Sequence, residues 1–457
     1  MLPPTEDELY YWNWAQHLQA SYFDHPPMVA VLIRVSTAIF GDGLFGLRFF
    51  AVLLSFFLMY LVGHWCGRKE VVTLVLFTPL VFFGSMLITP DIPFLFFWGL
   101  YVWWLMSING TFSPWSDDPV NRVYHSSPVP FGKWVVGGAI LGLGLLSKYS
   151  MLLAIPCAFL VMFTRYRIRA WFSGFVLHLA IAGLFCLPVI LFNMKHQWAP
   201  FLFQFNHALS GSTSGYFTRY VGSQIALVGL LPFLMLPWIA IRLRDLLQHP
   251  LLNVALWFFA IPFFFALFQG RSNYVEANWA LMSYLTFWPI AQRLFNRNTI
   301  GFLGKPLLWI GFAPALVFTA LGFVHTIYPL KQISPEKDRL ARIKEQMNLI
   351  QTVTKDLREN DVQAPLYSTN YQLIAAFRYY GHPNTYQFPL TTRPSNFSFD
   401  TEDPCKYTEI LSIHVSGENM PGVQCFPQRE TLREYMLAVK GKPITQYELV
   451  RYYRLPE

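Results

Sequence analysis

The chain has 457 residues, of which 54% are hydrophobic, 18% aromatic and only 13% charged, and its mean hydropathy is +0.35. A soluble domain carries about 25% charged residues, so this composition excludes an ordinary soluble protein and indicates that lipid surrounds most of the chain. The net charge of +8 comes from short Lys and Arg clusters between apolar runs, which favours a role in membrane topology over a nucleic-acid surface. Five cysteines without a CxxC pair, and no HExxH, give no support to a zinc site.

Apolar runs that can cross a bilayer, which takes about 20 residues, recur over the first 327 residues. Each must be a helix, because a backbone in hydrocarbon has to satisfy its own hydrogen bonds. The runs lie near residues 43–65, 70–88, 92–108, 132–148, 173–193, 220–242, 250–268, 274–292 and 306–327, with a shorter one at 150–164. We therefore predict an all-α polytopic membrane domain of about ten spans over residues 1–327.

Basic residues orient these spans through the positive-inside rule. They fall in alternate loops, at Arg68 and Lys69, at Arg165, Arg167 and Arg169, at Arg242 and Arg244, and at Arg293, Arg297 and Lys305. These loops are predicted to be cytoplasmic, and so by parity is the loop 109–131, whose Asp117 and Asp118 offset Arg122. The N-terminal segment, the remaining loops and the tail after residue 328 therefore face outward. Nothing precedes the N-terminal segment that would translocate it. We therefore expect that a first transmembrane helix is missing from this sequence.

The tail, residues 328–457, has the composition of a soluble domain and is predicted to be a small α/β domain. Ser334-Pro335-Glu336 reads as a helix start. Strand-like segments near 363–368, 407–415 and 443–453 alternate with helical ones near 371–380 and 428–439. Cys405 and Cys425 both lie in this tail, so a disulfide between them is expected if the tail faces an oxidising compartment.

The outward-facing segments hold nearly all the ionisable residues that the positive-inside rule leaves unexplained. The first of them begins with Asp7 and Glu8, followed by a run of Tyr and Trp residues typical of an interfacial helix. A carboxylate pair at the membrane surface is well placed to act as a general base toward a lipid-borne substrate. The alternative is that both residues only favour a helix N-terminus.

Two further acidic positions carry a similar ambiguity. Asp24 and His25 precede two prolines and can hydrogen-bond within the turn that these fix. Asp91 lies in a very short turn between two apolar runs, where a carboxylate is costly and therefore a functional candidate, although capping of a helix is the alternative.

Lys148 and Arg271 are cations on the predicted outer face, where the positive-inside rule disfavours them. A lipid phosphate would satisfy Lys148, because lysine binds phosphate as a point charge; snorkelling toward headgroups is the alternative. Arg271 repeats the argument, with a salt bridge to Glu276 as the alternative. Two cations and several carboxylates on one face suggest acid/base chemistry on a phosphate-bearing substrate.

Four motifs, in order, resemble bacterial membrane glycosyltransferases of the family that includes protein O-mannosyltransferases and lipid A aminoarabinose transferases. They are DELYYWNWAQHLQASYFDHPPMVA, TPDIPFLFFW, LGLGLLSKYS and FLFQFNHAL, the last containing Gln204 and His207. In the tail, LYSTNYQLIAAFRYYG is similar to the family's soluble domain. The resemblance therefore covers nearly the whole chain, and it implies a GT-C fold with a polyprenyl-phosphate-linked sugar donor.

The resemblance also implies roles for individual residues. The acidic pair corresponds to Asp7 and Glu8, with Asp7 as the base that takes a proton from the acceptor hydroxyl during an inverting attack. Lys148 and Arg271 would stabilise the leaving lipid phosphate. The acceptor side would be shaped or supported by Asp24, His25, Asp91, Gln204, His207 and Glu276. The protein would lie in a bacterial inner membrane, with its active site and tail on the periplasmic side. The acceptor would be lipopolysaccharide or lipid A, another glycan or a protein. No metal or other cofactor is expected to be essential.

The family has a transmembrane helix before the acidic pair, and this sequence does not. Three other interpretations remain at this point. A transporter or lipid flippase could also hold a phosphate with Lys148, but the internal repeats and broken, charged helices typical of transporters are not apparent. A membrane scaffold would not need Asp7 and Lys148 to converge, and an O-antigen ligase or polymerase would carry a large outer loop in place of this tail.

Overall fold

The structure is a computed structural model of the chain. It describes residues 2–66, 78–108, 129–209, 216–271, 275–296, 304–330, 332–360, 363–389, 391, 393–418, 420 and 423–455. Two compact units make up the chain: one contains residues 25–29 and 48–322, and the other contains residues 1–24, 30–47 and 323–457. We call them the helical unit and the terminal unit. The predicted domain boundary at residue 327 stays a prediction.

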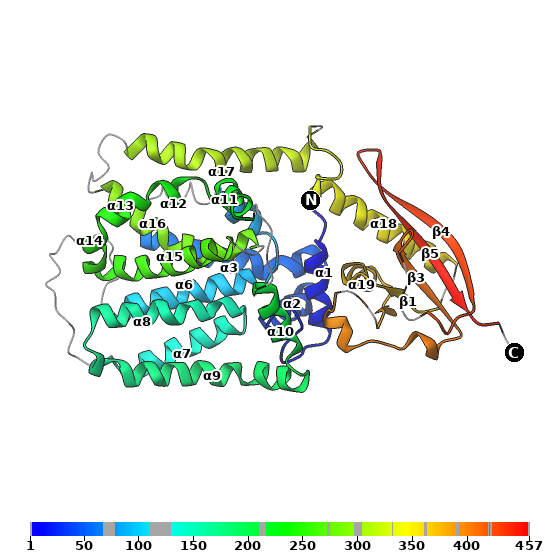
Figure 1. The fold of residues 1–457 in the computed structure, drawn as a ribbon, viewed down its shortest axis with the longest axis horizontal. Helices are drawn as coiled ribbons and strands as arrows, with labels where there is room; N and C mark the ends of the chain where they lie inside the picture. The colour runs from blue at the N-terminus through cyan, green and yellow to red at the C-terminus, as the bar shows by residue number, and fades with distance from the viewer. Residues whose placement is uncertain are drawn as a thin grey trace. The chain divides into compact units, whose positions relative to one another are not determined.

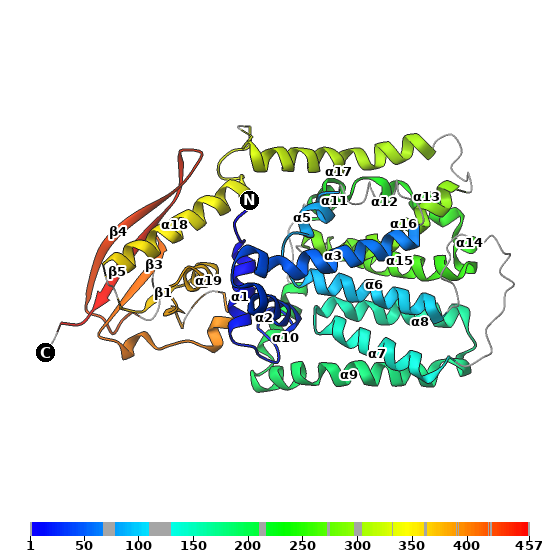
Figure 2. The same ribbon diagram turned by 180° about the vertical axis from the view of Figure 1, so that it is seen from behind.

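The helical unit is built from apolar helices, which Figures 1 and 2 show as a bundle. Its helices are α3 (Leu44–Cys66), α5 (Pro79–Gly84), α6 (Asp91–Ile108), α7 (Phe131–Leu145), α8 (Ala154–Arg165), α9 (Phe172–Lys195), α10 (Ala199–Leu209), α11 (Tyr216–Val228), α12 (Leu231–Leu234), α13 (Leu236–Ile241), α14 (Leu243–Gln248), α15 (Pro250–Gln269), α16 (Leu281–Asn296) and α17 (Gly304–Ile327), the last running into the terminal unit. Short 3₁₀ turns lie at Tyr149–Leu153, Ile168–Ala170 and Ala277–Ala280.

Five described helices are long and apolar enough to cross a membrane, namely α3, α6, α9, α15 and α17. α6 and α15 are the more buried of these inside the unit, whereas α3, α9 and α17 expose apolar side chains along most of their length. Because apolar side chains that face outward need a hydrocarbon solvent, the protein is a multi-pass membrane protein. The shorter α7 packs against α6 and α9, and α15 packs against α8 and α16. Residues 70–77 of the predicted run at 70–88 lie outside the described residues, and the described remainder contains only the short helix α5.

The run predicted as one helix over 220–242 is broken. α11 ends at Val228, and the following helical stretch Leu231–Ile241 is turned by 107° from it. Gly229 sits at the break with φ +90°, a conformation that favours glycine, and the Leu230 amide donates to the Gly311 carbonyl of α17 at 2.7 Å. The hydrophobic length was read correctly, but a single straight span over these residues was wrong.

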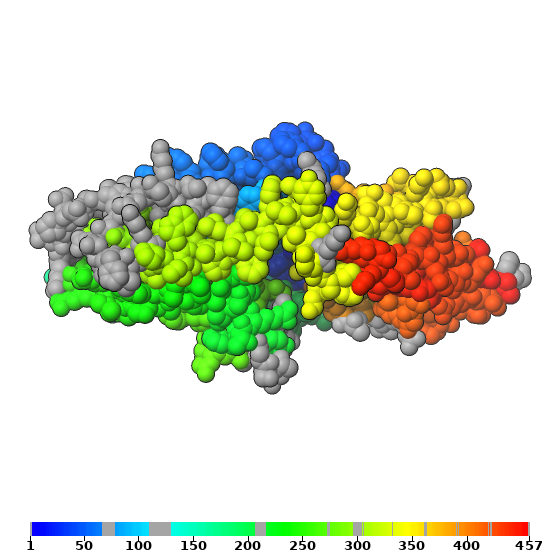
Figure 3. All heavy atoms as spheres, turned by 90° about the horizontal axis from the view of Figure 1, so that it is seen from above, coloured from blue at the N-terminus to red at the C-terminus, as the bar shows by residue number. Residues whose placement is uncertain are grey.

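The terminal unit joins the start of the chain to its tail. It contains α1 (Glu6–Gln16), most of α2 (Met28–Phe40), α18 (Arg339–Glu359) and α19 (Tyr371–Tyr379), with strands β1 (Leu366–Ser368), β2 (Thr385–Gln387), β3 (Glu409–Val415), β4 (Gln428–Val439) and β5 (Lys442–Tyr453). The sheet order is β2-β1-β3-β5-β4; β1 pairs in parallel with β2 and β3, and β5 pairs antiparallel with β3 and β4. α1 packs against α19, and α18 against β4, which lies beside it in Figure 3.

The helix predicted near 428–439 is wrong, because this segment is strand β4. Its sequence QRETLREYMLAV is rich in good helix formers. The turn decides otherwise: Lys440 and Gly441 both have positive φ, 52° and 76°, as a two-residue hairpin turn of the I′ type requires. The hairpin then pairs β4 with β5 over their whole length. The long tail helix also begins later than expected, at Arg339, with Asp338 rather than Ser334 as its N-cap.

Candidate functional site

The first turn of α1 separates the two predicted catalytic carboxylates by environment. Glu8 is fully buried, and its Oε2 accepts from the Thr5 amide at 2.9 Å while the Thr5 hydroxyl accepts from the Glu8 amide at 3.3 Å. These reciprocal bonds form a capping box, which satisfies backbone donors at the helix start. Glu8 thus performs the helix-supporting role that the sequence left open for both carboxylates.

Asp7 takes no part in the capping box and is half-buried. Its Oδ1 accepts from the side-chain amide of Gln372 in α19 at 3.3 Å, and this is the one hydrogen bond that the described residues make to its side chain. An ionised carboxylate can accept about four hydrogen bonds. Asp7 therefore keeps the capacity to accept a proton or hydrogen bond from a further group.

Asp24 anchors α1 to the tail. Its Oδ2 accepts from the Tyr10 hydroxyl at 2.9 Å, and its Oδ1 lies 3.4 Å from the Arg393 guanidinium. The Tyr10 oxygen in turn accepts from the Asn396 amide at 2.6 Å. Burial and then the charge of Asp24 raise the pKa of Tyr10 well above its ordinary value, so this phenol stays protonated and keeps donating. The Arg393 guanidinium also lies over the Tyr371 ring, 4.1 Å from its centroid.

A second polar cluster lies in the helical unit. Lys148, just after α7, forms an ion pair with Asp91 at the start of α6, with 2.6 Å between Nζ and Oδ1. Asn278 donates its side-chain amide to the other carboxylate oxygen at 2.7 Å. Both charged side chains are only 12–13% exposed. The structure thus brings together two residues that the sequence placed in separate loops, and it gives the predicted phosphate-binding lysine a carboxylate partner.

The remaining predicted site residues lie as follows. Arg271 and Glu276 are both exposed, and within the described part of the chain they form no ion pair with each other, so the salt bridge considered for them is absent. His25 is half-buried in the turn before α2, and Gln204 is half-buried on α10. His207 falls in α10, but its side chain lies outside the described residues.

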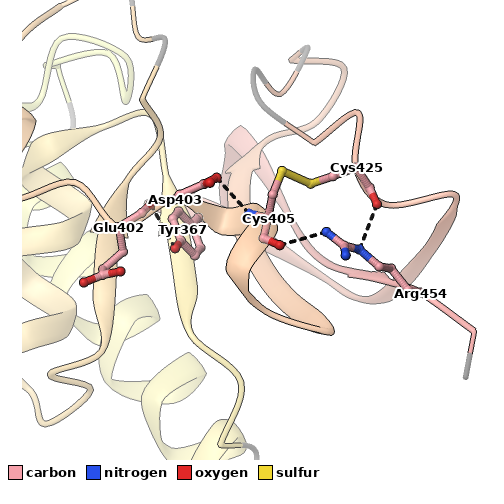
Figure 4. The surroundings of a disulfide bond; sticks show 6 residues. All are labelled: Tyr367, Glu402, Asp403, Cys405, Cys425 and Arg454. Carbon is pink, nitrogen blue, oxygen red and sulfur yellow. Dashed lines mark hydrogen bonds between the residues drawn. A yellow bond between two sulfur atoms is a disulfide. The ribbon is translucent and has the colours of Figure 1, made fainter.

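Cys405 and Cys425 are joined by a disulfide in the terminal unit. Figure 4 shows the guanidinium of Arg454 between the two cysteines, donating to the carbonyl oxygens of Cys405 at 2.8 Å and of Cys425 at 3.0 Å. The loop closed by the disulfide is thereby fastened to the end of β5. Among the described residues, no group of three or more His, Cys, Asp and Glu side chains could hold a metal ion.

Sequence reasoning missed Gln372, Asn278 and Arg393. Gln372 lies inside LYSTNYQLIAAFRYYG, a motif that was taken only as a sign of the soluble domain. Asn278 lies two residues after Glu276, which was itself a candidate site residue. Gln372 and Asn278 have neutral side chains, so the pattern of charged residues did not mark them. Their contacts with Asp7 and Asp91 could be found only from the fold.

Comparison with known proteins adds three findings. A family model described as dolichyl-phosphate-mannose-protein mannosyltransferase matches residues 24–113. The lipid A galacturonosyltransferase of Rhizobium johnstonii is 21% identical over 74% of this chain and 69% of its own length. The undecaprenyl phosphate-alpha-4-amino-4-deoxy-L-arabinose arabinosyl transferase of Pseudomonas aeruginosa is 25% identical over 71% of this chain and 60% of its own length. The chain thus spans about two thirds of the length of these relatives.

The fold has a close counterpart among solved structures. ArnT from Cupriavidus metallidurans superposes with a TM-score of 0.63 in its apo state, at 14% identity, over 98% of this chain and 94% of that one. The same protein bound to undecaprenyl phosphate gives 0.62 at 13% identity. Both the helical and the terminal unit therefore have counterparts in one known fold.

Proposed function

We propose that this chain, a member of the GT-C membrane glycosyltransferases, moves a sugar from a polyprenyl phosphate to an acceptor hydroxyl. The observation that carries the proposal is the match of nearly the whole chain to a fold that has been solved with undecaprenyl phosphate bound. The two curated relatives are named for transfer of galacturonic acid and of aminoarabinose, and one of them for an undecaprenyl phosphate donor. The donor sugar is accordingly a hexose or a pentose, and the acceptor is lipid A, another glycan or a protein.

Asp7 is the base in this proposal. The acceptor hydroxyl gives its proton to Oδ2 of Asp7 while its own oxygen attacks the anomeric carbon. The bond between that carbon and the phosphate oxygen breaks with inversion, and the polyprenyl phosphate leaves with the electron pair. Asp7 is half-buried and accepts one side-chain hydrogen bond from the described residues, which supports this role. Glu8 is buried and accepts from both the amide and the hydroxyl of Thr5, so it supports the helix that carries Asp7.

Lys148 and Arg271 stabilise the negative charge that gathers on the departing phosphate. Lys148 is held by Asp91, which offsets its charge before a donor arrives. A phosphate then shares the three donors of the ammonium group with Asp91 or takes the place of that carboxylate. His25, Gln204, His207 and Glu276 belong to the acceptor side. The leaving group is a phosphate monoester, so the reaction is proposed to run without an essential metal, at the periplasmic face of the inner membrane.

The test is transfer from a radiolabelled polyprenyl-phosphate sugar pool to membrane acceptors, with the native chain compared with Asp7→Asn, Glu8→Gln and Lys148→Ala. Asp7→Asn lacks the base, so its rate of sugar transfer should be about 10²- to 10⁴-fold lower than that of the native chain. Glu8→Gln is the matched control, because glutamine also completes a capping box. Its transfer should stay close to that of the native protein.

Unchanged transfer by Asp7→Asn would remove the proposed base while leaving the glycosyltransferase assignment in place. Unchanged transfer by Lys148→Ala would remove the phosphate contact. If the native chain, folded in membranes, transfers no sugar from any of several polyprenyl-phosphate donors, the proposed function is wrong, and lipid translocation by the same protein becomes the measurement to make.

A further inference from the structure

The side chain of Asp7 accepts one hydrogen bond from the described residues. The donor is Gln372, which lies 365 positions later in the chain. We propose that Gln372 is a positioning residue for the catalytic carboxylate, so that the C-terminal tail takes part in the reaction. This inference rests on the proposed function, because it assigns Gln372 a role through Asp7. Gln372 itself touches neither the sugar nor the phosphate in this proposal.

The backbone around Gln372 is held firmly. Asn370 caps the start of α19, and its side-chain oxygen accepts from the backbone N–H of Gln372 at 2.8 Å. The next five residues, Leu373–Phe377, are all buried in the core of the terminal unit. A rigid helix start therefore presents the Gln372 side chain, and the reach of that side chain decides where the Asp7 carboxylate can lie.

α1 is fixed against α19 at a second point, about one helical turn further along α19. The side-chain amide of Asn13 donates both to Leu9 in its own helix, at 2.9 Å, and to the Ala375 carbonyl in α19, at 3.0 Å. Tyr10, which lies between Asp7 and Asn13 in α1, meets the ring of Tyr371 edge to face, with centroids 4.7 Å apart. The two helices thus cannot slide past each other without breaking the contacts of Tyr10 and Asn13 as well as that of Asp7.

The chemistry of the pair suits positioning rather than proton transfer. A glutamine amide nitrogen only donates, so it can orient a carboxylate but cannot take a proton from the acceptor. Its bond to Oδ1 leaves Oδ2 for the acceptor hydroxyl. A misplacement of 1 Å in such a group can cost about 100-fold in rate, so a side chain that fixes the rotamer of Asp7 matters even though it does no chemistry itself.

The other ionisable groups near Asp7 do not supply this function. Burial and then the charge of Asp7 raise the pKa of Glu6 and of Tyr371, so Tyr371 stays neutral near pH 7. The charges of Arg342 and Arg339 of α18 lower the pKa of Glu6. The charge of Arg393 lowers the pKa of Tyr371, and that of Asp24 raises it. The direct hydrogen bond to Asp7 comes from Gln372.

The test compares Gln372→Leu and Gln372→Glu with the native chain in the transfer assay, with kcat and KM separated. Loss of one hydrogen bond to a charged group should lower kcat of Gln372→Leu by about 10- to 100-fold, with KM for the donor nearly unchanged. Gln372→Glu sets a second carboxylate against Asp7, so the acid side of its pH–rate profile should move to higher pH. Gln446→Leu is the matched control, because Gln446 also donates to a carboxylate, Glu434, at 2.7 Å, but in the β4–β5 hairpin.

The combined variant Asp7→Asn/Gln372→Leu separates positioning from folding. If Gln372 acts through Asp7, the combined variant should be no slower than Asp7→Asn alone. A further multiplicative loss would show that Gln372 only supports the fold, and it would overturn the proposal. Native-like kcat in Gln372→Leu, together with a dead Asp7→Asn, would also overturn it while leaving the proposed function intact. A native chain without transfer would overturn both.

Discussion

At the level of single residues, the pairing of Lys148 with Asp91 changes how the lysine is understood. Each side chain is only 12–13% exposed, and the carboxylate is bonded on both oxygens, by Lys148 and by Asn278. Removing one partner of a buried pair leaves an uncompensated charge, which costs more than losing both partners together. Loss of Lys148 alone can therefore reduce transfer by damaging the fold as well as by removing a phosphate contact.

We expect Lys148→Met to lower the free energy of unfolding by about 3–5 kcal/mol, because Asp91 is left without its cation. The double variant Lys148→Met/Asp91→Asn should recover most of that loss while still failing to transfer sugar. Thermal unfolding in detergent measures the first effect, and the transfer assay measures the second. Equal instability of the single and double variants would contradict this explanation, because the loss would then not come from the unpaired charge of Asp91.

The sequence indicated which charged residues lie at the predicted outer face but not which role each of them has. Asp7 and Glu8 are adjacent, and only the position of the helix start decides that Glu8 completes the capping box while Asp7 stays available. Gln372 could not be connected with Asp7 by any local pattern, since the contact spans 365 residues. The roles of Asp7, Lys148 and Arg271 stay predictions until transfer is measured.

At the level of elements, hydropathy located the membrane helices well and their breaks poorly. α3, α6, α9, α15 and α17 agree with predicted runs to within a few residues. The break after α11 depends on one close approach, because the backbone at Gly229 touches that of Gly311 in α17. β4 was assigned to the wrong class because helix propensity is a weak guide when a hairpin turn and a neighbouring strand specify the pairing.

Gly229→Ala should destabilise the helical unit markedly. A Cβ there would overlap the Gly311 carbonyl oxygen, and alanine resists a φ of +90°. We expect a lower midpoint of thermal unfolding in detergent than for the native chain. Gly183→Ala is the matched control, since a Cβ at Gly183 in α9 meets no atom within 4 Å. Equal midpoints for the two variants would contradict the proposed backbone contact.

At the level of the whole molecule, the start and the tail of the chain fold into one unit. This arrangement requires α1 and the tail to lie on the same side of the membrane, as the distribution of Lys and Arg had predicted. The disulfide of the terminal unit then bears on topology as well as stability, because such bonds persist in oxidising compartments and are rare in the cytosol.

Native protein from bacterial membranes should therefore give no maleimide labelling of Cys405 or Cys425 until a reductant is added under denaturing conditions. Cys405→Ala/Cys425→Ala, which opens a loop with a sequence separation of 20, should lose about 3 kcal/mol of stability. Gel shifts with a polymer-linked maleimide measure the first effect, and thermal unfolding measures the second. Free thiols at both positions without reductant would argue against the outward tail.

The contact between Asp7 and Gln372 also has a consequence in time. Ribosomes add about 5–20 residues per second, so a separation of 365 residues delays the arrival of Gln372 by roughly 20–70 seconds after Asp7 has been made. By then the intervening apolar helices have been synthesised. A nascent chain would thus carry its carboxylate for most of its synthesis without the amide that aims it, and full transfer activity would appear only once the tail has reached the same side of the membrane and folded.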